Sequence, residues 1–393
     1  MAQTIPNRIS SVDAYRGFVM FLMMAEVLEF GHISKALPES SFWAFLAFNQ
    51  DHVEWVGCSL HDLIQPSFSF LVGVALPYSV ASRVAKGQTF RDMFGHTLQR
   101  SLILIFLGVF LRSMHREQTN FTFEDTLSQI GMGYPFLFWF GFKSVRTQLI
   151  ALATILVGYW LFFFLYPLPD ASFDYAAVGV TPDWEHNLKG LAAHWNKNTN
   201  AAWAFDQWFM NLFPREKPFI RNGGGYSTLS FIPTLGTMTL GLLAGQWLKD
   251  ETSPKEKALK FVAMGVSLLI IALTLNWLGI CPNVKRIWTP TWVLFSGGWC
   301  FILLAAFFWL VDIQGYRKAF FWLIVIGMNS IAAYVISHTI VEFIHHSIQI
   351  HISKTYDQAF GMTYEPLVRG GLILFVEWSI LYWMYKNRIF VRI

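Results

Sequence analysis

The chain has 393 residues, of which 54% are hydrophobic and 14% are charged, and its formal net charge is +4. Soluble domains carry about 25% charged residues, so this chain has too little polar surface for a soluble, disordered, fibrous or nucleic-acid-binding protein. The three cysteines show no metal-binding or redox spacing, and we expect neither a disulfide framework nor a thiolate metal site. The composition predicts an integral membrane protein with many spans.

Largely apolar blocks, most of them long enough to cross a ~30 Å hydrocarbon layer, recur along the chain. They predict ten spans, near residues 11–33, 61–82, 100–112, 126–142, 147–166, 227–248, 259–279, 291–311, 319–340 and 367–385. Backbone in lipid must satisfy its own hydrogen bonds, and the alternation of a β-barrel is absent, so all ten should be helices. The expected fold class is therefore all-α polytopic, with residues 1–393 as one integral-membrane domain.

The placement of lysine and arginine predicts the orientation, because cytoplasmic loops are enriched in these residues. Basic residues concentrate on short loops near 83–100, 143–146, 249–260 and 317–318, with Arg8 and the tail residues Lys386, Arg388 and Arg392 on the same side. The first seventeen residues lack the features of a signal peptide, so the first apolar block should stay in the mature chain. Both termini are predicted to be cytoplasmic.

The longest connection, residues 167–226, then lies on the outer side. It contains Trp184, Trp195, Trp203 and Trp208 and is too aromatic for a disordered linker. A loop of this length usually has a function of its own, which predicts a cap over the outer face. Two interpretations remain open: an interfacial segment that only packs, or a cap that contacts substrate.

Ionisable residues inside spans are costly and are functional candidates by default. Asp13 and Arg16 are three positions apart at the start of the first span, so they can form an ion pair on one helical face. The pair either locks the helix end or places the arginine near a phosphate or carbonyl group. Glu26 and Glu29, near the outer end of the same span, either form a base or cation site or simply reach the interface.

The densest polar cluster beside the membrane covers residues 51–62, with His52, Glu54, His61 and Asp62 among its members. A carboxylate beside an imidazole fixes its tautomer and raises its basicity, as a general base or a nucleophilic histidine requires. Alone, His52 reads more readily as a surface-loop residue, and Asp62 could cap the helix that follows it. His345, His346 and His351 have no usual metal-ligand spacing, and no metal is expected.

Four stretches carry a resemblance to a known family. They are residues 11–17 (SVDAYRG); residues 52–57 (HVEWVG) with 62–68 (DLIQPSF); residues 226–234 (YSTLSFIPT) with 241–245 (GLLAG); and residues 285–294 (KRIWTPTWVL) with 309–312 (WLVD) and 327–330 (GMNS). The opening stretch resembles that of membrane-bound acyltransferases in general. Together, in this order over nearly the whole chain, the four resemble the heparan-alpha-glucosaminide N-acetyltransferase family and its bacterial relatives.

The resemblance implies a ten- or eleven-helix homodimeric enzyme of the bacterial inner membrane that takes an acetyl group from cytoplasmic acetyl-CoA and delivers it across the membrane. In the animal members, the acceptor is the amine of a terminal glucosamine. His52 matches the catalytic histidine, and the orientation predicted from charge places it on the outer side. Two stretches depart from the family: residues 26–29 (EVLE), where an asparagine is common, and 121–127 (FTFEDTL), where an Arg-Pro-Gly turn is common. Both departures concern contacts with the acceptor.

These observations assign roles to individual residues. His52 either accepts the acetyl group as an acyl-imidazole or deprotonates the acceptor amine, while Asp62 or Glu54 orients its ring. Residues predicted to bind acetyl-CoA are Asp13, Arg16, Arg100, Ser227, Thr228, Asn329 and Ser330. For the last four, hydrogen bonds between helices are an equally good interpretation. Glu26, Trp55 and Trp292 are predicted to bind the sugar, although an interfacial aromatic belt also explains tryptophans.

A transporter of sugars or small anions is the alternative function, since ten spans, buried charges and an outer cap would suit one. Transporters are typically built from repeats with broken helices in paired positions. The sequence shows no such repeat.

Overall fold

The structure is a computed structural model, and it describes residues 9–391. Arg8 and Arg392, which contributed to the predicted orientation, lie outside this range. The described residues fold into α-helices and short 3-10 or π turns without a β-strand, and one isolated bridge joins Val56 to Val284. The protein is therefore an all-α polytopic membrane protein.

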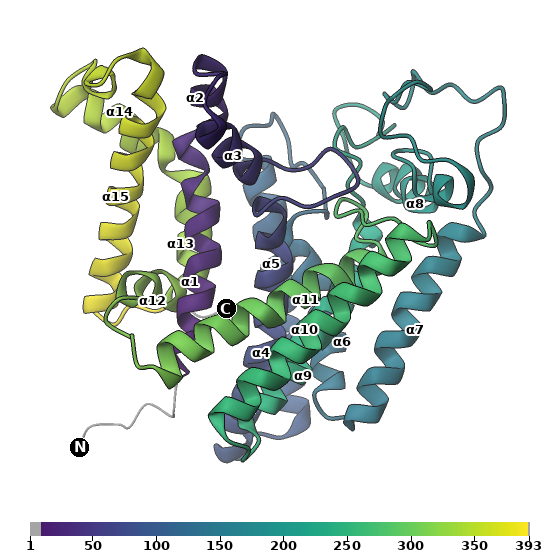
Figure 1. Cartoon of the computed structure of the whole chain (residues 1–393), viewed down its shortest axis with the longest axis horizontal. Helices are drawn as coiled ribbons and strands as arrows, with labels where there is room; N and C mark the ends of the chain where they lie inside the picture. Colours follow the sequence, from purple (N-terminus) through teal and green to yellow (C-terminus); the bar gives the residue numbers. More distant parts are fainter. Residues whose placement is uncertain (1–8, 392–393) are drawn as a thin grey trace.

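The helices follow one another along the chain as shown in Figure 1. Their bounds are α1 Ser10–Met24, α2 Phe30–Ala36, α3 Ser41–Gln50, α4 Ile64–Ala85, α5 Phe90–Ser113, α6 Thr126–Phe140, α7 Val145–Phe164, α8 Ala201–Phe209, α9 Phe231–Lys249, α10 Pro254–Trp277, α11 Pro290–Phe307, α12 Phe321–Met328, α13 Ser330–Thr339, α14 Val341–His351 and α15 Glu365–Lys386.

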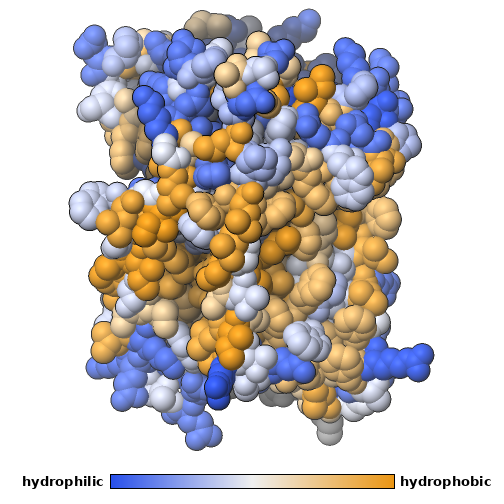
Figure 2. Space-filling view, turned by 90° about the vertical axis from the view of Figure 1, so that its right-hand side faces the viewer, coloured by the Kyte–Doolittle hydropathy of each residue, from blue (hydrophilic) through white to orange (hydrophobic). Residues whose placement is uncertain are grey.

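Seven helical segments within residues 9–391 are long and apolar enough to cross a membrane, or nine if two bent pairs each count as one span. The predicted count of ten is not confirmed. The remaining predicted span, near 126–142, corresponds to α6, which has only 15 residues and falls below the length needed. Figure 2 shows the resulting surface, in which a hydrophobic band lies between two hydrophilic zones.

The two bent pairs are α1–α2, with an angle of 44°, and α12–α13, with an angle of 82°. The first bend falls at Glu29, whose φ of 45° is left-handed and interrupts the helical backbone. The second falls at Asn329, where φ is −128° and ψ is 39°. The sequence did not predict either break, because residues 11–33 and residues 319–340 were each predicted to form one continuous span.

The centre of the bundle is the contact between α4 and α9. Gly73 of α4 packs against the carbonyl oxygen of Met238, and Gly241 of α9 packs against that of Phe70. A side chain at either position would collide with the facing backbone, so glycine allows the two helices to approach this closely. Both helices begin on the same side of the bundle, next to the loop that precedes α4. Their contact therefore fixes the two helix ends beside which the candidate site lies.

Residues 167–226, the cap, fold over one end of the bundle between α7 and α9, and α8 lies within them (Figure 1). Trp195 of the cap is fully buried and stacks on Phe163 of α7, with ring centroids 6.3 Å apart. Its carbonyl oxygen accepts a hydrogen bond of 3.1 Å from Trp55 Nε1. The cap is thus fastened to the loop that carries His52, and this side of the molecule is called the cap face below.

Candidate functional site

His52 and Asp62 are in direct contact on the cap face. His52 Nδ1 lies 2.8 Å from Asp62 Oδ1, and the His52 side chain is one-third exposed while Asp62 is fully buried. Asp62 lies in the 3-10 turn His61–Leu63 that leads into α4, so the rigid start of a span holds the carboxylate. An Nδ1–H donated to Asp62 leaves the Nε2 lone pair free for a base or a nucleophile.

The second carboxylate oxygen of Asp62 holds the surrounding loop. Asp62 Oδ2 accepts hydrogen bonds from Ser59 N at 3.0 Å, Ser59 Oγ at 3.1 Å and Val53 N at 3.3 Å. These bonds stabilise the ionised carboxylate and also fix the backbone directly after His52. Asp62 therefore closes the loop as well as orienting the imidazole.

Lys285 is the third residue of the site and contacts both His52 and Asp62. Its Nζ lies 3.3 Å from Asp62 Oδ1, 3.0 Å from His52 Nδ1 and 3.3 Å from His52 Nε2, and its side chain is 4% exposed. When Nδ1–H donates to Asp62, Nε2 carries the one ring lone pair that the Lys285 ammonium can approach. Lys285 thus contacts both Asp62 and His52, and Nε2 can react only when the ammonium is directed to Asp62.

The loop between α10 and α11 presents Lys285. Thr289 Oγ1 accepts a hydrogen bond from Val284 N at 3.1 Å and donates one to the Pro282 carbonyl at 2.8 Å, which closes the loop. The loop is joined to the His52 loop through the Val56–Val284 bridge and through Gly57 N, which donates to the Asn283 carbonyl at 3.2 Å. Gly57 has a φ of 130°, a conformation that favours glycine.

Burial sets the ionisation of the two basic groups. It lowers the pKa of His52 below its usual value, and the positive charge of Lys285 lowers it further while Asp62 opposes the shift. Burial also lowers the pKa of Lys285 to about 8, again opposed by Asp62. Near neutral pH the site therefore combines a neutral imidazole with a largely charged ammonium, which suits attack on a carbonyl whose oxygen becomes negative.

A second imidazole lies beside the first. The rings of His61 and His52 have centroids 4.5 Å apart, and His61 Nε2 lies 3.1 Å from Glu26 Oε1. Glu26, predicted to bind the acceptor, comes from the turn after α1 and is more than half exposed. The structure therefore brings Glu26 to the edge of the His52 site through His61.

Arg286 forms the wall towards the cap. Its Nη1 donates to the Gly224 carbonyl at 2.9 Å and its Nη2 to the Val53 carbonyl at 3.1 Å, and the guanidinium lies 5.2 Å from the Tyr226 ring centre. These contacts connect the segment before α9 to the His52 loop. Arg286 therefore joins Tyr226 and Gly224 to the loop that carries His52.

Three predicted site residues are directed elsewhere. Glu54 is two-thirds exposed and its Oε2 lies 3.4 Å from His186 Nε2 in the cap, so Asp62 rather than Glu54 contacts His52. Trp55 and Trp292 are both fully buried, and Trp292 stacks on Phe295 within α11. Neither indole presents a face to a sugar; Trp55 instead holds the cap.

Four of the residues predicted to bind acetyl-CoA lie far from His52, near the first turn of α1. Arg16 Nη1 lies 3.9 Å from Asp13 Oδ1. Gly327 packs on the Asp13 carbonyl, which places Asn329 and Ser330 beside the same turn. Asn329 is buried, and its side chain donates to the Ile389 carbonyl at 2.9 Å and accepts from Val391 N at 3.1 Å. The C-terminal segment thus uses both polar atoms of the Asn329 amide.

The other three do not join this group. Arg100 of α5 donates to Tyr134 Oη at 3.2 Å and lies over the same ring. Ser227 and Thr228 precede α9 on the cap face, where Ser227 Oγ is 3.0 Å from Ser230 Oγ and Thr228 N donates to Asp206 Oδ2 at 2.9 Å. The seven residues therefore do not form one cluster in this structure.

Sequence reasoning did not include Lys285 or His61 among the site residues. Lys285 stands within one of the four stretches that carry the resemblance, but a basic pair before a span is typical of a membrane interface. Only the fold shows that this lysine is buried against Asp62. His61 was seen in the polar cluster, yet nothing in the sequence indicated that its ring packs on His52.

Comparison with known proteins identifies distant relatives. The chain is 22% identical to the heparan-alpha-glucosaminide N-acetyltransferases of Mus musculus and Homo sapiens, over 98% and 99% of its own length. It covers 61% and 60% of those proteins, so it spans about three-fifths of the length of the relatives that it matches. No family profile matches the chain. The near-complete alignment supports a distant relationship to these enzymes.

Proposed function

We propose that the protein is a transmembrane acetyltransferase that moves an acetyl group from acetyl-CoA to the amine of an amino sugar. The observation that carries this proposal is the contact group of His52, Asp62 and Lys285 on the cap face. The relatives are named for transfer of an acetyl group to a glucosaminide, which agrees with this chemistry. A neutral imidazole with an orienting carboxylate can act as the base, and a nearby ammonium can stabilise the oxyanion, in acyl transfer to an amine.

In the proposed reaction, the acetyl carbon–sulfur bond breaks and a carbon–nitrogen bond to the acceptor forms. His52 Nε2 either takes the acetyl group first, as an acyl-imidazole, or takes the proton from the attacking amine. Asp62 stabilises the positive charge that develops on the ring, and Lys285 stabilises the oxyanion at the thioester carbonyl. The acceptor amine loses one proton and the leaving thiolate gains one, so the products are the acetylated amine and the free thiol of coenzyme A. Both routes use the same Nε2 lone pair.

The proposed orientation has acetyl-CoA in the cytoplasm of a bacterial cell, both termini on that side and the cap outside, with the chain working as a homodimer in the inner membrane. The helix ends opposite the cap carry many basic residues, among them Lys86, Arg91, Lys143, Lys249 and Lys255. A cytoplasmic location for this end follows the positive-inside rule. The coenzyme A end of the donor would then bind near Asp13, Arg16 and Asn329, and its acetyl thioester would extend between the helices to His52. The acceptor would approach His52 beside Glu26.

The test is acetyl transfer by the full chain in liposomes, with radiolabelled acetyl-CoA and glucosamine. We expect the parent to form labelled N-acetylglucosamine and His52→Ala to lose at least about 10²-fold in rate. His351→Ala, which changes an exposed histidine of α14, is the matched control and should retain the parent rate. Transfer at the parent rate by His52→Ala would remove His52 from the mechanism. Incubation with the donor alone, followed by peptide mass spectrometry, separates an acetylated His52 from direct transfer.

One observation favours the alternative, a transporter. The bends in α1–α2 and α12–α13 give two broken spans, and broken helices are typical of transporter binding sites. In the same liposomes, a transporter would accumulate labelled glucosamine without acetylating it. Acetylated product in the parent and none in His52→Ala would exclude transport as the main activity.

A further inference from the structure

The helix α3, which ends two residues before His52, has an apolar face that no other part of residues 9–391 covers. Phe42, Phe45 and Phe48 are 61%, 65% and 57% exposed, and their spacing of three residues places them on one side of the helix. None of the ten residues of α3 is charged, and none is buried. A group of exposed aromatic side chains of this kind indicates an interaction surface.

The opposite side of α3 packs against the protein. The ring centre of Trp43 lies 6.1 Å from that of Phe30 in α2 and 6.1 Å from that of Tyr364 in the turn before α15. These contacts hold α3 in one orientation. Because side chains follow the helical period, the three phenylalanines on the other side point away from the bundle.

The C-terminal end of α3 is bound to the first span. Gln50 Nε2 donates to the Ala25 carbonyl at 2.7 Å, and Gln50 Oε1 accepts from Phe30 N at 2.6 Å, on either side of the bend at Glu29. Ala25 follows the 15 residues of α1, which rise about 22 Å, so it lies within the ~30 Å thickness of a hydrocarbon layer. Figure 1 shows α3 beside the end of α1 that is nearest the cap face. α3 therefore lies at the edge of that layer.

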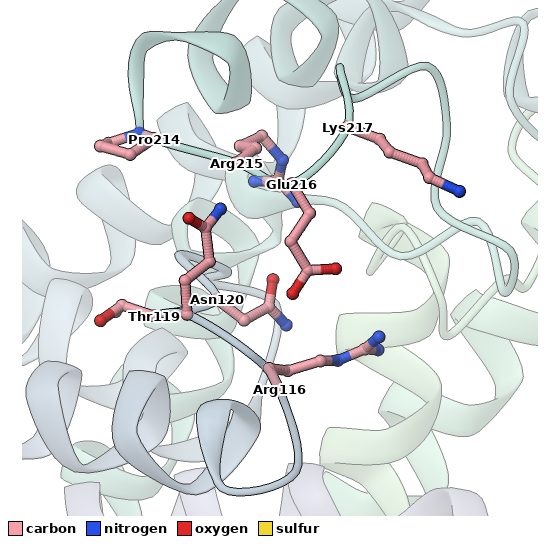
Figure 3. A pocket seen from close by; sticks show the side chains of 8 residues that line it. Arg116, Thr119, Asn120, Pro214, Arg215, Glu216 and Lys217 are labelled. Atoms are coloured by element: carbon pink, nitrogen blue, oxygen red, sulfur yellow. The ribbon is translucent and has the colours of Figure 1, made fainter.

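The absence of charge separates α3 from segments that face water. The open pocket between the loop after α5 and the segment after α8 is lined by charged side chains, Arg116, Arg215, Glu216 and Lys217 (Figure 3). α3 has no charged residue between Glu39 and Asp51. Its outer face instead resembles the surface of a span such as α5, where Phe106 and Phe110 are exposed to a similar extent.

The size of the apolar face favours lipid over a second copy of the chain. A buried aromatic side chain covers about 150–250 Å², so three that are about three-fifths exposed offer roughly 270–450 Å². Stable protein–protein interfaces bury about 800 Å² on each partner. Lipid acyl chains need no complementary surface of that size, because they adapt to the shape of any apolar face.

We propose that Phe42, Phe45 and Phe48 insert among the acyl chains of the lipid leaflet on the cap face. Asn49 Oδ1 accepts a hydrogen bond from Leu60 N at 3.2 Å, which closes the loop that carries His52 onto the end of α3. Insertion of α3 would therefore fix the height of His52 relative to the lipid headgroups. This anchor acts whatever reaction takes place at His52.

Photocrosslinking identifies what covers the face. Phe45 is replaced by p-benzoylphenylalanine in the full chain, which is irradiated in phosphatidylcholine liposomes, and peptide mass spectrometry detects the adducts. The same replacement at Phe106 of α5 is the control for lipid contact, and at Asp183 in the cap it is the control for an exposed polar position. The yield of lipid adduct at Phe45 should be close to that at Phe106. It should exceed that at Asp183 at least about tenfold, because burial of a phenylalanine side chain favours the apolar environment by that factor or more.

Hydrogen exchange at the Leu60 amide tests the anchor. The combined variant Phe42→Ser, Phe45→Ser and Phe48→Ser removes the apolar face, and exchange at Leu60 should then rise about tenfold, as local opening of the loop becomes easier. The matched control carries Phe42→Leu, Phe45→Leu and Phe48→Leu. It keeps the face apolar and should retain the exchange rate of the parent.

Three results would overturn the proposal. Crosslinks between two copies of the chain in place of lipid adducts would make the face an interface between copies. A yield at Phe45 no higher than at Asp183 would place α3 in water. Parental exchange at Leu60 in the serine variant would show that insertion does not hold the His52 loop. The crosslinking result stands by itself if the serine variant does not fold, because that chain carries one aromatic replacement only.

Discussion

Lys285 Nζ lies 3.3 Å from Asp62 Oδ1, and this contact joins the loop before α11 to the start of α4 across the fold. Both side chains are almost completely shielded from water. A buried ion pair contributes little net stability, because desolvation offsets the attraction, but removing one partner leaves an uncompensated charge. We therefore expect the pair to act mainly on His52, which contacts both Asp62 and Lys285.

Asp62→Asn should reduce both activity and stability. The amide keeps the size of the side chain but leaves Lys285 without its counter-charge, at a cost of about 3 kcal/mol in the free energy of unfolding. The acetylation rate should fall at least about 10²-fold, since an amide neither fixes the His52 tautomer nor stabilises the imidazolium. Thermal unfolding in detergent and the transfer assay measure the two effects. Asp183→Asn, an exposed cap residue, should change neither.

The pH dependence of transfer should be bell-shaped. Since the pKa of His52 is lowered from 6.5, the imidazole stays neutral to a lower pH, and the acid limb of kcat/KM should have its midpoint below 6.5. Since the pKa of Lys285 is about 8, the ammonium is lost above that pH and activity should decline there. Rates between pH 5 and 9 test this, and an acid limb at or above 6.5 would contradict the assignment of His52.

Lys285→Met should change the pH profile in two ways. The alkaline limb should disappear, because the group that titrates near pH 8 is gone. The acid limb should move to higher pH, because the charge of Lys285 no longer disfavours the imidazolium while Asp62 still favours it. Lys189→Met, in the cap, is the control. If the alkaline limb persists in Lys285→Met, it belongs to another group, such as the acceptor amine.

The amino-acid sequence predicted the fold class well, because the length of an apolar block is enough to indicate a membrane-spanning helix. The predicted span near 126–142 is a helix, α6, but its 15 residues leave the count of ten spans unconfirmed, and the break before Ser330 was not predicted. Asn329 is compatible with a continuous helix, and its two hydrogen bonds to the C-terminal segment are tertiary contacts that no local sequence pattern records.

The site was predictable only in part. The spacing of the polar cluster brought His52 and Asp62 into consideration together, and the structure places them 2.8 Å apart. The sequence alone could not show whether Asp62 or Glu54 contacts His52, because side-chain direction in a loop depends on tertiary contacts such as the pairing of Glu54 with His186. Lys285 comes from a distant loop and was therefore missed. The catalytic roles themselves stay predictions.

The contact between α4 and α9 should tolerate no side chain at Gly241. Gly241→Leu would collide with the Phe70 carbonyl, and overpacking of this kind costs about 1–3 kcal/mol in the free energy of unfolding. The thermal midpoint of the detergent-purified protein should fall accordingly. Gly158→Leu is the matched control, because a side chain there meets open space on α7. An equal thermal midpoint for both variants would show that α4 and α9 are less closely packed than the structure indicates.

Asn329 provides a test of the predicted acetyl-CoA site. Because its amide binds the Ile389 carbonyl and Val391 N, Asn329→Ala should raise hydrogen exchange at the Val391 amide about tenfold, as the loss of roughly 1.4 kcal/mol of hydrogen bonding would produce. If Asn329 also binds the donor, the variant should raise KM for acetyl-CoA while KM for the acceptor stays constant. Ser330→Ala, next in the chain, should leave Val391 exchange unchanged. Faster exchange with unchanged kinetics would limit Asn329 to holding the C-terminal segment and place the donor elsewhere.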